Sequence, residues 1–304
     1  MMNLYTEAME KRTLGNTGML VTVLGFGGAE IGFENAPYET VEPLLHSALD
    51  AGLNLIDTAE CYKTSEEMIG RAVSSRRSEY FLFTKTGHSD DGDHWNPEKM
   101  AHGIDQSLQR LSTDRVDLIQ LHSCSEELLR KGDVIQVLKR AQEAGKTRFI
   151  GYSGDGEAAR YAVECGAFET LQTSVSIADQ ESIELTVPFA RERGMGVIAK
   201  RPIANAAWKT GAKPASPYHQ PYWERLEQLQ YDFLKGAPDQ AVSTALRFTL
   251  SVPGVDTAIV GTKNPERWKQ NAALASQGPL SPEQFEAIRE RWRRIAKPDW
   301  MGQT

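Results

Sequence analysis

The sequence predicts an α/β protein whose strands close into a (β/α)8 barrel, or TIM barrel, with an N-terminal β-hairpin and extra helices near the C-terminus. Eight short apolar segments are each followed by a segment with helical periodicity, and strict alternation of this kind implies a parallel sheet. Eight such units in roughly 250 residues fit a closed barrel. An open sheet usually carries the pattern GxGxxG after its first strand, whereas residues 25–30 read GFGGAE and do not complete it.

The strands are predicted from short apolar runs that end in polar or turn residues. Before them, residues 11–26 begin with two strand-like pieces around the turn sequence GNTG, which indicates a hairpin over residues 10–23. We expect this hairpin to cover the floor of the barrel, since the chain enters the barrel there. The eight predicted barrel strands are 24–26, 53–57, 80–84, 116–121, 146–152, 170–174, 195–199 and 258–260.

The helices are predicted from apolar residues at helical spacing and from their end signals. Gly52, Gly145 and Gly194 stop three of them, and Pro97 lies in the first turn of another. The predicted helices between strands are 40–51, 64–74, 97–111, 131–143, 156–164, 181–192, 238–251 and 264–274.

Two segments exceed a minimal barrel. Residues 201–235 form a long irregular loop with an extra helix, and residues 281–304 form a helix and tail. Long loops in compact domains are usually functional or disordered. No linker rich in serine and glycine divides the chain, so residues 1–304 are predicted to be a single domain.

Composition excludes several classes of protein. The net charge of −7 and the absence of a basic stretch argue against nucleic-acid binding. No run of about 18 apolar residues exists, and the N-terminal sequence MMNLYTEAMEKR lacks the apolar core of a secretory signal. Three widely spaced cysteines argue against a disulfide framework and lack the spacing of a zinc site. We therefore expect a cytoplasmic protein without a metal, a nucleic-acid partner or a membrane partner.

Titratable residues stand at the ends of three consecutive predicted strands. Asp57 ends the second strand and Tyr62 follows it, Lys85 ends the third and His122 ends the fourth. Singly, each has a plain structural reading: Asp57 as a helix cap with Tyr62 packed on it, Lys85 as a solvated lysine, and His122 as a polar core residue. Because the carboxyl ends of barrel strands carry the active site, the four together favour one catalytic site.

The chemistry that this set suits is proton donation by a phenol. A free tyrosine has a pKa of about 10, and a nearby ammonium group is expected to lower it. Lys85 would supply that ammonium, Asp57 would keep Lys85 charged, and His122 would orient the substrate oxygen. The set fits the protonation of an oxygen that becomes negative, as when a hydride reaches a carbonyl carbon.

The chain resembles the aldo-keto reductase superfamily at six segments spread over nearly its whole length. They read LGFGG (24–28), DTAECY (57–62), FTK (83–85), DLIQLH (117–122), GYS (151–153) and VGTKNPER (260–267). The resemblance implies a (β/α)8 barrel and hydride transfer between NADP(H) and a small-molecule carbonyl compound. It implies Tyr62 as the general acid, Asp57 and Lys85 as the groups that tune it, and His122 as the residue that orients the carbonyl.

The end of the eighth strand fits a phosphate site. Residues 261–263 precede a helix, so backbone amides and a helix N-terminus face that place. Lys263 and Arg267 add positive charge suited to a 2′-phosphate, which favours NADP over NAD. The alternative is that Arg267 and Lys269 merely solvate the helix.

The resemblance extends the cofactor site to other strand ends. Ser153 and Gln172 would hold the carboxamide, Gln270 and Asn271 would meet the adenine, and residues 201–205 would run along the pyrophosphate. The expected cofactor-binding residues are Gly28, Asp57, Ser153, Gln172, Lys200, Arg201, Ile203, Gly261, Thr262, Lys263, Arg267, Gln270 and Asn271.

Two positions depart from the family pattern. Gly154 follows Ser153 where the family commonly has asparagine. Lys200 stands where the family often stacks an aromatic ring on the nicotinamide, and a lysine there would repel the oxidised, positively charged ring. Neither departure touches the four catalytic positions.

The substrate pocket is expected to include Tyr62, Trp95 and His122. Aromatic residues in loops over a pocket suit an apolar or aromatic carbonyl substrate, although Trp95 and Trp208 can equally pin their own loops. Cys61 and Cys124 are read as small apolar fillers, with a redox-sensitive thiol as the alternative.

Two other functions stay open at this point. One is a nucleotide-binding sensor or auxiliary subunit with little turnover. The other is an isomerase or hydrolase in which Lys263 and Arg267 bind a substrate phosphate. The complete set of catalytic residues favours the reductase, and the sequence leaves the substrate, the direction and the oligomeric state open.

Overall fold

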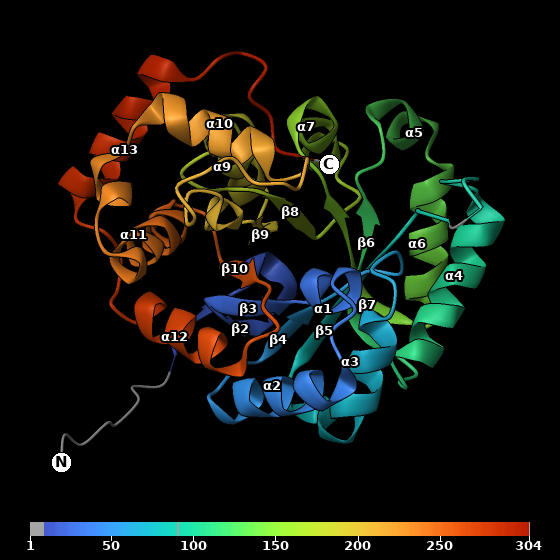
Figure 1. The fold of residues 1–304 in the computed structure, drawn as a ribbon. Helices are drawn as coiled ribbons and strands as arrows, with labels where there is room; N and C mark the ends of the chain where they lie inside the picture. Colours follow the sequence, from blue (N-terminus) through green and yellow to red (C-terminus); the bar gives the residue numbers. More distant parts are fainter. Residues whose placement is uncertain (1–8, 90, 304) are drawn as a thin grey trace.

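Eight parallel strands close into a barrel in a computed structural model that describes residues 9–89 and 91–303 (Figure 1). Around the barrel the strand order is β10–β3–β4–β5–β6–β7–β8–β9, so each strand pairs with its neighbours in sequence and the last pairs with the first. This confirms the predicted (β/α)8 class. The barrel strands are β3 (Leu24–Gly27), β4 (Leu55–Asp57), β5 (Phe81–Thr86), β6 (Val116–His122), β7 (Thr147–Ser153), β8 (Thr170–Ser174), β9 (Gly196–Lys200) and β10 (Thr257–Val260).

Helices surround the barrel on all sides in Figure 1, as a parallel sheet with both faces buried requires. Those that follow the predicted positions are α2 (Tyr38–Asp50), α3 (Ser65–Val73), α4 (Pro97–Arg110), α6 (Asp133–Glu143), α7 (Gly156–Glu164), α11 (Pro238–Ser251) and α12 (Pro265–Ala275). The extra segments are α10 (Gln220–Leu229), α13 (Pro282–Ile295) and the 3₁₀ turns η2 (Ser74–Glu79), η3 (Ala204–Ala206) and η4 (Asp232–Lys235).

Three helical details differ from the sequence-based expectation. The predicted helix 181–192 is two helices, α8 (Ser182–Leu185) and α9 (Val187–Glu192), because Thr186 leaves helical geometry with φ −127° just before Pro188. Two short helices, α1 (Ala29–Phe33) and α5 (Glu126–Lys131), lie where loops were expected. The end signals of α5 were present, since the Ser125 hydroxyl accepts a hydrogen bond from the Leu128 amide (3.3 Å) and Gly132 ends the helix in the left-handed region.

The N-terminal hairpin covers the floor of the barrel as expected. It pairs β1 (Lys11–Thr13) with β2 (Leu20–Thr22) in antiparallel register, around the 3₁₀ turn η1 (Gly15–Thr17). Apolar side chains of the hairpin and of four barrel strands form one buried cluster, made of Leu14, Met19, Val21, Leu55, Phe83, Leu118 and Ile198.

The inward-facing positions of the strands change from apolar to polar along the barrel axis. Side chains two residues apart on a strand face the same side, so each of the four barrel-strand residues of the floor cluster shares its face with a polar residue nearer the carboxyl end. The pairs, floor residue first, are Leu55 and Asp57, Phe83 and Lys85, Leu118 and Gln120, and Ile198 and Lys200. The barrel therefore has an apolar floor and a polar mouth, and the mouth holds the predicted catalytic groups.

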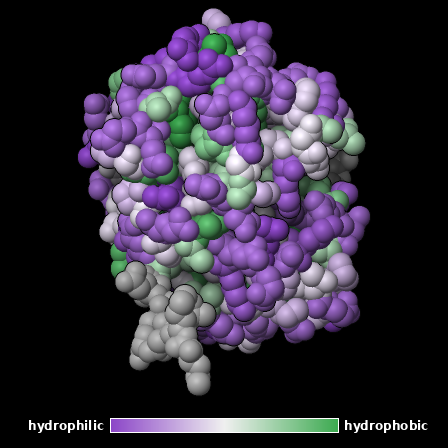
Figure 2. Space-filling view, turned by 60° about the vertical axis from the view of Figure 1, so that its left-hand side comes forward, coloured by the Kyte–Doolittle hydropathy of each residue, from purple (hydrophilic) through white to green (hydrophobic). Residues whose placement is uncertain are grey.

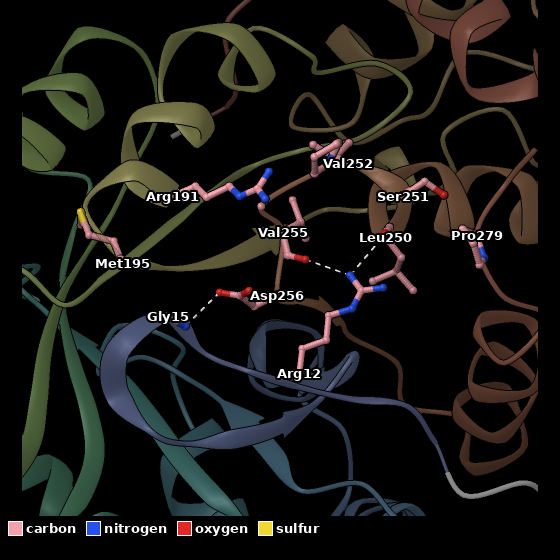
Figure 3. Close-up of a pocket in the computed structure, with 13 residues that line it drawn as sticks. Arg12, Gly15, Arg191, Met195, Leu250, Ser251, Val252, Val255, Asp256 and Pro279 are labelled. Atoms are coloured by element: carbon pink, nitrogen blue, oxygen red, sulfur yellow. Dashed lines mark hydrogen bonds between the residues drawn. The ribbon is translucent and has the colours of Figure 1, made fainter. Parts of the chain in front are cut away.

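A hollow of about 480 Å³ lies at the floor end, and Figure 3 shows how its polar side chains tie the hairpin to the barrel. The Arg12 guanidinium donates to the carbonyl oxygens of Leu250 (3.0 Å) and Val255 (2.9 Å). The Asp256 carboxylate accepts from the amides of Gly15 (3.2 Å) and Val197 (2.9 Å). These contacts hold the hairpin, β9 and β10 together at the end of the barrel away from the mouth.

The chain returns to the mouth at its C-terminal end. In Figure 1 the segment after α13 runs to α7, and Arg225 of α10 holds it there by donating to the Met301 carbonyl oxygen (2.6 Å) while pairing with the buried Asp179. Trp300 of this tail is buried and packs on Trp292, with ring centroids 5.5 Å apart. The predicted single domain (1–304) includes residues 1–8 and 304, and the predicted C-terminal helix and tail (281–304) includes residue 304. These residues lie outside the described part of the chain, so the single-domain prediction stays a prediction.

The face of the molecule in Figure 2 is mostly hydrophilic. On the face in Figure 2, hydrophobic residues form small patches separated by hydrophilic ones. In the described part of the chain, no helix combines the length and the apolar character needed to cross a bilayer.

Replacement of Asp256 tests the ties at the floor. Asp256→Ala removes the acceptor of two backbone N–H groups, and we expect the free energy of unfolding to fall by about 1–3 kcal/mol in urea denaturation. Asp114→Ala, at an exposed aspartate, is the control and should change it by less than about 0.5 kcal/mol. An equal effect of both changes would contradict the assigned role of Asp256.

Candidate active site

The strand register places several of the predicted site residues side by side at the mouth. His122 of β6 lies opposite Ser153 of β7, which in turn lies opposite Gln172 of β8. On the next pair, Ser174 of β8 lies opposite Lys200 of β9. Because parallel strands all end at the same rim of the barrel, residues far apart in sequence become neighbours there.

An ion pair between Lys85 and Asp57 forms the centre of the site. The Lys85 Nζ lies 2.5 Å from the Asp57 Oδ2, both side chains are fully buried, and Nζ also donates to the Thr58 carbonyl oxygen (2.9 Å). The other carboxylate oxygen accepts from the amide Nε2 of Gln172 (3.0 Å) and more distantly of Gln120 (3.4 Å). These contacts satisfy a charge pair that burial would otherwise penalise.

Burial and pairing oppose each other in the pKa values of this pair. Burial raises the pKa of Asp57, and the nearby Lys85 ammonium only partly offsets it. Burial acts to lower the pKa of Lys85, but Asp57 and Tyr62 outweigh it, so the pKa of Lys85 is raised. Lys85 therefore stays an ammonium at neutral pH, as the sequence suggested.

Tyr62 lies between this ion pair and His122. The Lys85 Nζ is 5.0 Å from the centroid of the Tyr62 ring, and the His122 ring meets it edge-on at 5.6 Å. The expected lowering of the Tyr62 pKa is wrong in direction for the protein alone: burial raises it, and the opposing effect of Lys85 is smaller. The phenol is consequently protonated at neutral pH, which is the form that can donate a proton.

His122 is held from both sides by neighbouring side chains. Its Nδ1 is 3.4 Å from the Cys61 Sγ, and its ring meets the His88 ring edge-on at 5.1 Å. Burial, followed by the charge of Lys85, places the pKa of His122 well below its ordinary value, so the imidazole is neutral. A neutral imidazole has one N–H group and one acceptor nitrogen.

Trp95 lies one layer behind His122. Its ring is 5.2 Å from that of His88, which separates it from His122, and its amide donates to the Gly87 carbonyl oxygen (2.9 Å). The structure thus brings Tyr62 and His122 together, with His88 next to them. A contact between Trp95 and substrate stays a prediction, while the reading that Trp95 pins its loop accounts for the contacts it makes.

Ser153 and Gln172 extend the polar network from Asp57. Both are buried, and the Ser153 hydroxyl donates to the Gln172 Oε1 (3.1 Å) while Gln172 donates to Asp57. The residues expected at the carboxamide are therefore directly linked to those expected at the proton donor.

Lys200 is paired with an acid that the sequence reading did not identify. Its Nζ lies 2.9 Å from the buried Asp155 carboxylate, which also accepts from the Thr173 hydroxyl (2.8 Å) and the Ser174 amide (2.7 Å). Burial lowers the pKa of Lys200 to about 8, against the opposing effect of Asp155. Asp155 thus compensates the charge that was expected to repel an oxidised nicotinamide.

Residues 201–206 form a strained turn after β9. Arg201, Ala204, Asn205 and Ala206 all have positive φ (45–57°), a conformation that costs energy for residues other than glycine. The Arg201 guanidinium donates to the Ser174 hydroxyl (2.8 Å), and Ile203 packs against the core. The buried Nδ2 of Asn205 has no hydrogen-bond acceptor among the described residues.

Residues 261–264 connect β10 to α12. A Cβ added to Gly261 would lie 3.0 Å from the Gly27 carbonyl oxygen, so a side chain would crowd the junction with β3. Asn264 caps α12 by accepting from the amides of Glu266 (3.0 Å) and Arg267 (3.4 Å), and the Thr262 hydroxyl accepts from the Asn264 amide (3.1 Å).

The two expected phosphate-binding cations are only weakly engaged. Lys263 pairs with Glu34 (2.5 Å) where both side chains are about half exposed, and Arg267 lies 3.8 Å from the exposed Asp239. Exposed ion pairs of this kind contribute little to stability, so both cations are available to a ligand. Further along α12, Gln270 is exposed and Asn271 is buried.

These groups fit a phosphate-containing dinucleotide. The buried Nδ2 of Asn205 can donate a hydrogen bond to a phosphate oxygen. The Ser153 hydroxyl and the Gln172 side-chain amide suit a carboxamide, and the Arg267 guanidinium offers several N–H donors in one plane. Gly28 contributes indirectly: a Cβ there would lie 2.6 Å from the Ser65 hydroxyl, and its amide donates to the Asp57 carbonyl oxygen (2.7 Å). Its direct contact with a cofactor stays a prediction.

The sequence reading missed Gln120, Asp155 and the contact of Cys61 with His122. Gln120 was accessible to prediction, because it lies two residues before His122 and so faces the same side of β6. Asp155 had one signal, the need of a buried Lys200 for a counter-charge. No signal in the sequence predicted the contact of Cys61 with His122, since this contact depends on the conformation of the turn after β4.

Comparison with known proteins adds independent information. Residues 23–293 match the model of the aldo/keto reductase family. The chain is 26% identical to L-galactose dehydrogenase from Arabidopsis thaliana, over 88% of this chain and 89% of that protein. It is likewise 26% identical to the uncharacterized oxidoreductase YqkF from Bacillus subtilis, over 94% of this chain and 97% of that one.

A solved structure shares the fold. The holo form of aldo-keto reductase AKR11C1 from Bacillus halodurans superposes with a TM-score of 0.82, covering 96% of this chain and 99% of that one at 24% identity.

Removal of Lys85 tests the central ion pair. Lys85→Met leaves the Asp57 carboxylate buried without its partner, and we expect the free energy of unfolding to fall by about 3–5 kcal/mol at pH 7. Urea denaturation at several pH values measures the loss. Lys131→Met, which breaks a surface pair with Glu127, is the matched control and should cost at most about 1 kcal/mol.

The same variant has a defined pH dependence. The folded-state pKa of Asp57 is already above its ordinary value, and removing Lys85 takes away the strongest opposing group. A carboxyl group whose pKa is raised by folding destabilises the protein increasingly as the pH rises above about 4. The loss in free energy of unfolding caused by Lys85→Met should therefore be smaller at pH 5 than at pH 7. A deficit that grows on acidification would contradict the assignment.

Proposed function

The chain belongs to the aldo/keto reductase family, and from that premise we propose that it is an NADPH-dependent reductase of aldehydes or ketones in which Tyr62 is the proton donor. Membership of the family makes it an oxidoreductase that acts on small-molecule carbonyl compounds. The cofactor preference and the role of Tyr62 are the parts that we add.

One observation carries the proposal. A protonated phenol, a buried ammonium held by a carboxylate, and a neutral imidazole meet at the mouth of the barrel, with the Lys85 Nζ 5.0 Å from the Tyr62 ring and the His122 ring 5.6 Å from it. The phenol offers a proton, the ammonium offers positive charge, and the imidazole offers a hydrogen bond. This combination suits an oxygen that gains negative charge during reaction.

The chain's own residues act in sequence on that oxygen. The Nε2–H of neutral His122 donates a hydrogen bond to the carbonyl oxygen and orients it beside Tyr62. When the carbonyl carbon accepts a hydride, the C=O π electrons move to the oxygen, which takes the phenolic proton and becomes a hydroxyl. The phenolate left on Tyr62 is stabilised by Lys85, whose charge Asp57 maintains, and water then reprotonates it.

NADPH, when bound, supplies the hydride. Ser153 and Gln172 would hold its carboxamide, residues 201–205 would contact its pyrophosphate, and Gln270 and Asn271 would contact its adenine. Lys263 and Arg267 favour a 2′-phosphate because both are cations with little competition from their present partners.

The substrate side of the mouth is aromatic. The Phe33 ring is 5.4 Å from that of Tyr62 and 49% exposed, so it offers an apolar surface next to the proton donor. The His122 ring also adjoins Tyr62, at 5.6 Å, and the His88 ring is 5.1 Å from that of His122. We propose a small aldehyde or ketone with an apolar or aromatic substituent.

Replacement of Tyr62 tests the mechanism. Tyr62→Phe removes the proton donor, and we expect kcat for aldehyde reduction to fall by about 10²-fold or more, since general-acid catalysis typically contributes 10²–10⁴-fold. NADPH oxidation followed at 340 nm with methylglyoxal and nitrobenzaldehyde measures it.

Tyr161→Phe, at a tyrosine on α7 outside the site, is the matched control and should keep wild-type rates. Equal rates for Tyr62→Phe and wild type would overturn the mechanism. NADPH binding without turnover of a broad carbonyl panel by the wild type would favour a nucleotide-binding sensor instead.

Replacement of Arg267 tests the cofactor preference. Arg267→Ala should weaken NADPH binding by about 10- to 100-fold and leave NADH binding nearly unchanged, because a charge-assisted contact to phosphate contributes about 1.5–3 kcal/mol. Titration of the protein fluorescence with each nucleotide measures both. Lys269→Ala on the same helix is the control, and identical losses for both nucleotides in Arg267→Ala would show that Arg267 does not contact the 2′-phosphate.

A further inference from the structure

We propose that Cys61 is a positioning residue that fixes the proton of His122 on Nε2, so that this nitrogen faces the substrate as a donor. The role rests on the proposed function, because it matters only if His122 must donate to a carbonyl oxygen. It concerns a residue that the mechanism above leaves unused.

The geometry connects Cys61 to one nitrogen of His122 alone. The Sγ is 3.4 Å from Nδ1, within hydrogen-bonding distance for sulfur. Cys61 immediately precedes Tyr62, so the turn after β4 delivers both the proton donor and the group that contacts His122. In the part of the chain that the structure describes, no other side chain is hydrogen-bonded to this ring.

The protonation states leave one proton to place on the ring. Burial raises the pKa of the Cys61 thiol to about 11, and burial also places the pKa of His122 well below its ordinary value. At neutral pH the pair is therefore a thiol and a neutral imidazole, with one S–H and one N–H group.

Two arrangements of these protons are compatible with the contact. In the first, the thiol donates to Nδ1 and the ring proton is on Nε2. In the second, Nδ1–H donates to sulfur and Nε2 presents a lone pair. The thiol is both a weak donor and a weak acceptor, so the strength of the other partner decides: an unprotonated imidazole nitrogen is a strong acceptor, which favours the first arrangement. Only the first lets Nε2 donate to a carbonyl oxygen.

The other neighbours of His122 do not select between the nitrogens. Tyr62 and His88 meet the ring edge-on, at centroid distances of 5.6 and 5.1 Å. Lys85 acts on the ring as a positive charge, which disfavours the imidazolium form but leaves the choice of nitrogen open. Selection of the nitrogen therefore falls to Cys61.

Nuclear magnetic resonance of the protein labelled with ¹⁵N-histidine tests the proposal directly. The chain has six histidines, and loss of one set of signals in His122→Gln assigns His122. Two-bond ¹H–¹⁵N correlations at pH 7 then show which ring nitrogen is protonated. We expect Nε2–H in the wild type and in Cys61→Ser, whose hydroxyl can donate in place of the thiol, and a mixture of both tautomers in Cys61→Ala.

Activity provides the second measurement. Cys61→Ala should lower kcat/KM for an aldehyde by roughly two- to tenfold, the size expected for one weak hydrogen bond, and Cys61→Ser should recover most of it. Cys165→Ala makes the same chemical change at the C-terminal end of α7 and should alter neither the spectrum nor the rate.

An Nδ1–H tautomer in the wild type would overturn the proposal. So would a His122 spectrum that is unchanged in Cys61→Ala, even if activity falls, because the loss would then come from packing. Failure of the proposed function looks different: the wild type would show the Nε2–H tautomer but no turnover of carbonyl compounds.

Discussion

The buried ion pair of Lys85 and Asp57 is the constraint on which the rest of the site depends. Two opposite charges without solvent are stable only when their remaining hydrogen-bonding capacity is met. Here the amide of Gln172 and the carbonyl oxygen of Thr58 meet it, so three strands must end at matching heights. The closed barrel supplies those heights through its register. Tyr62 then gains a positively charged neighbour whose charge does not depend on solvent.

The fold and the place of the four central residues were predictable, because both follow from the periodicity of apolar residues and from the positions of polar residues at strand ends. Alternation of strands and helices implies the barrel, and the barrel implies that Asp57, Lys85 and His122 converge. Three features of the site were not predictable, since each depends on the conformation of a loop or on the balance of opposing effects on a pKa. The acid beside Lys200 lies after a different strand, the contact of Cys61 depends on the course of a turn, and the pKa of Tyr62 required weighing burial against a nearby charge.

The two positions that depart from the family pattern are connected in space. Gly154 is followed directly by Asp155, and the Asp155 carboxylate reaches across β8 to Lys200 (2.9 Å). A basic residue beside the nicotinamide position is therefore accompanied by its own counter-charge. The Asp155 carboxylate also accepts hydrogen bonds from Thr173 and Ser174, so the group that offsets the positive charge of Lys200 is itself held in place. Lys200 considered alone suggests repulsion of an oxidised nicotinamide, whereas Lys200 paired with Asp155 reduces that repulsion.

The change from apolar floor to polar mouth separates two tasks along each strand. Leu118 contributes packing at one end of β6 and His122 contributes chemistry at the other, about four residues away. Protein engineers can thus treat the two ends as independent modules. Substitutions at the floor, including those in the hairpin, address thermal tolerance, while substitutions around the rim address the range of compounds accepted. Directed evolution of this chain can run two libraries in parallel and combine their best members with little interference.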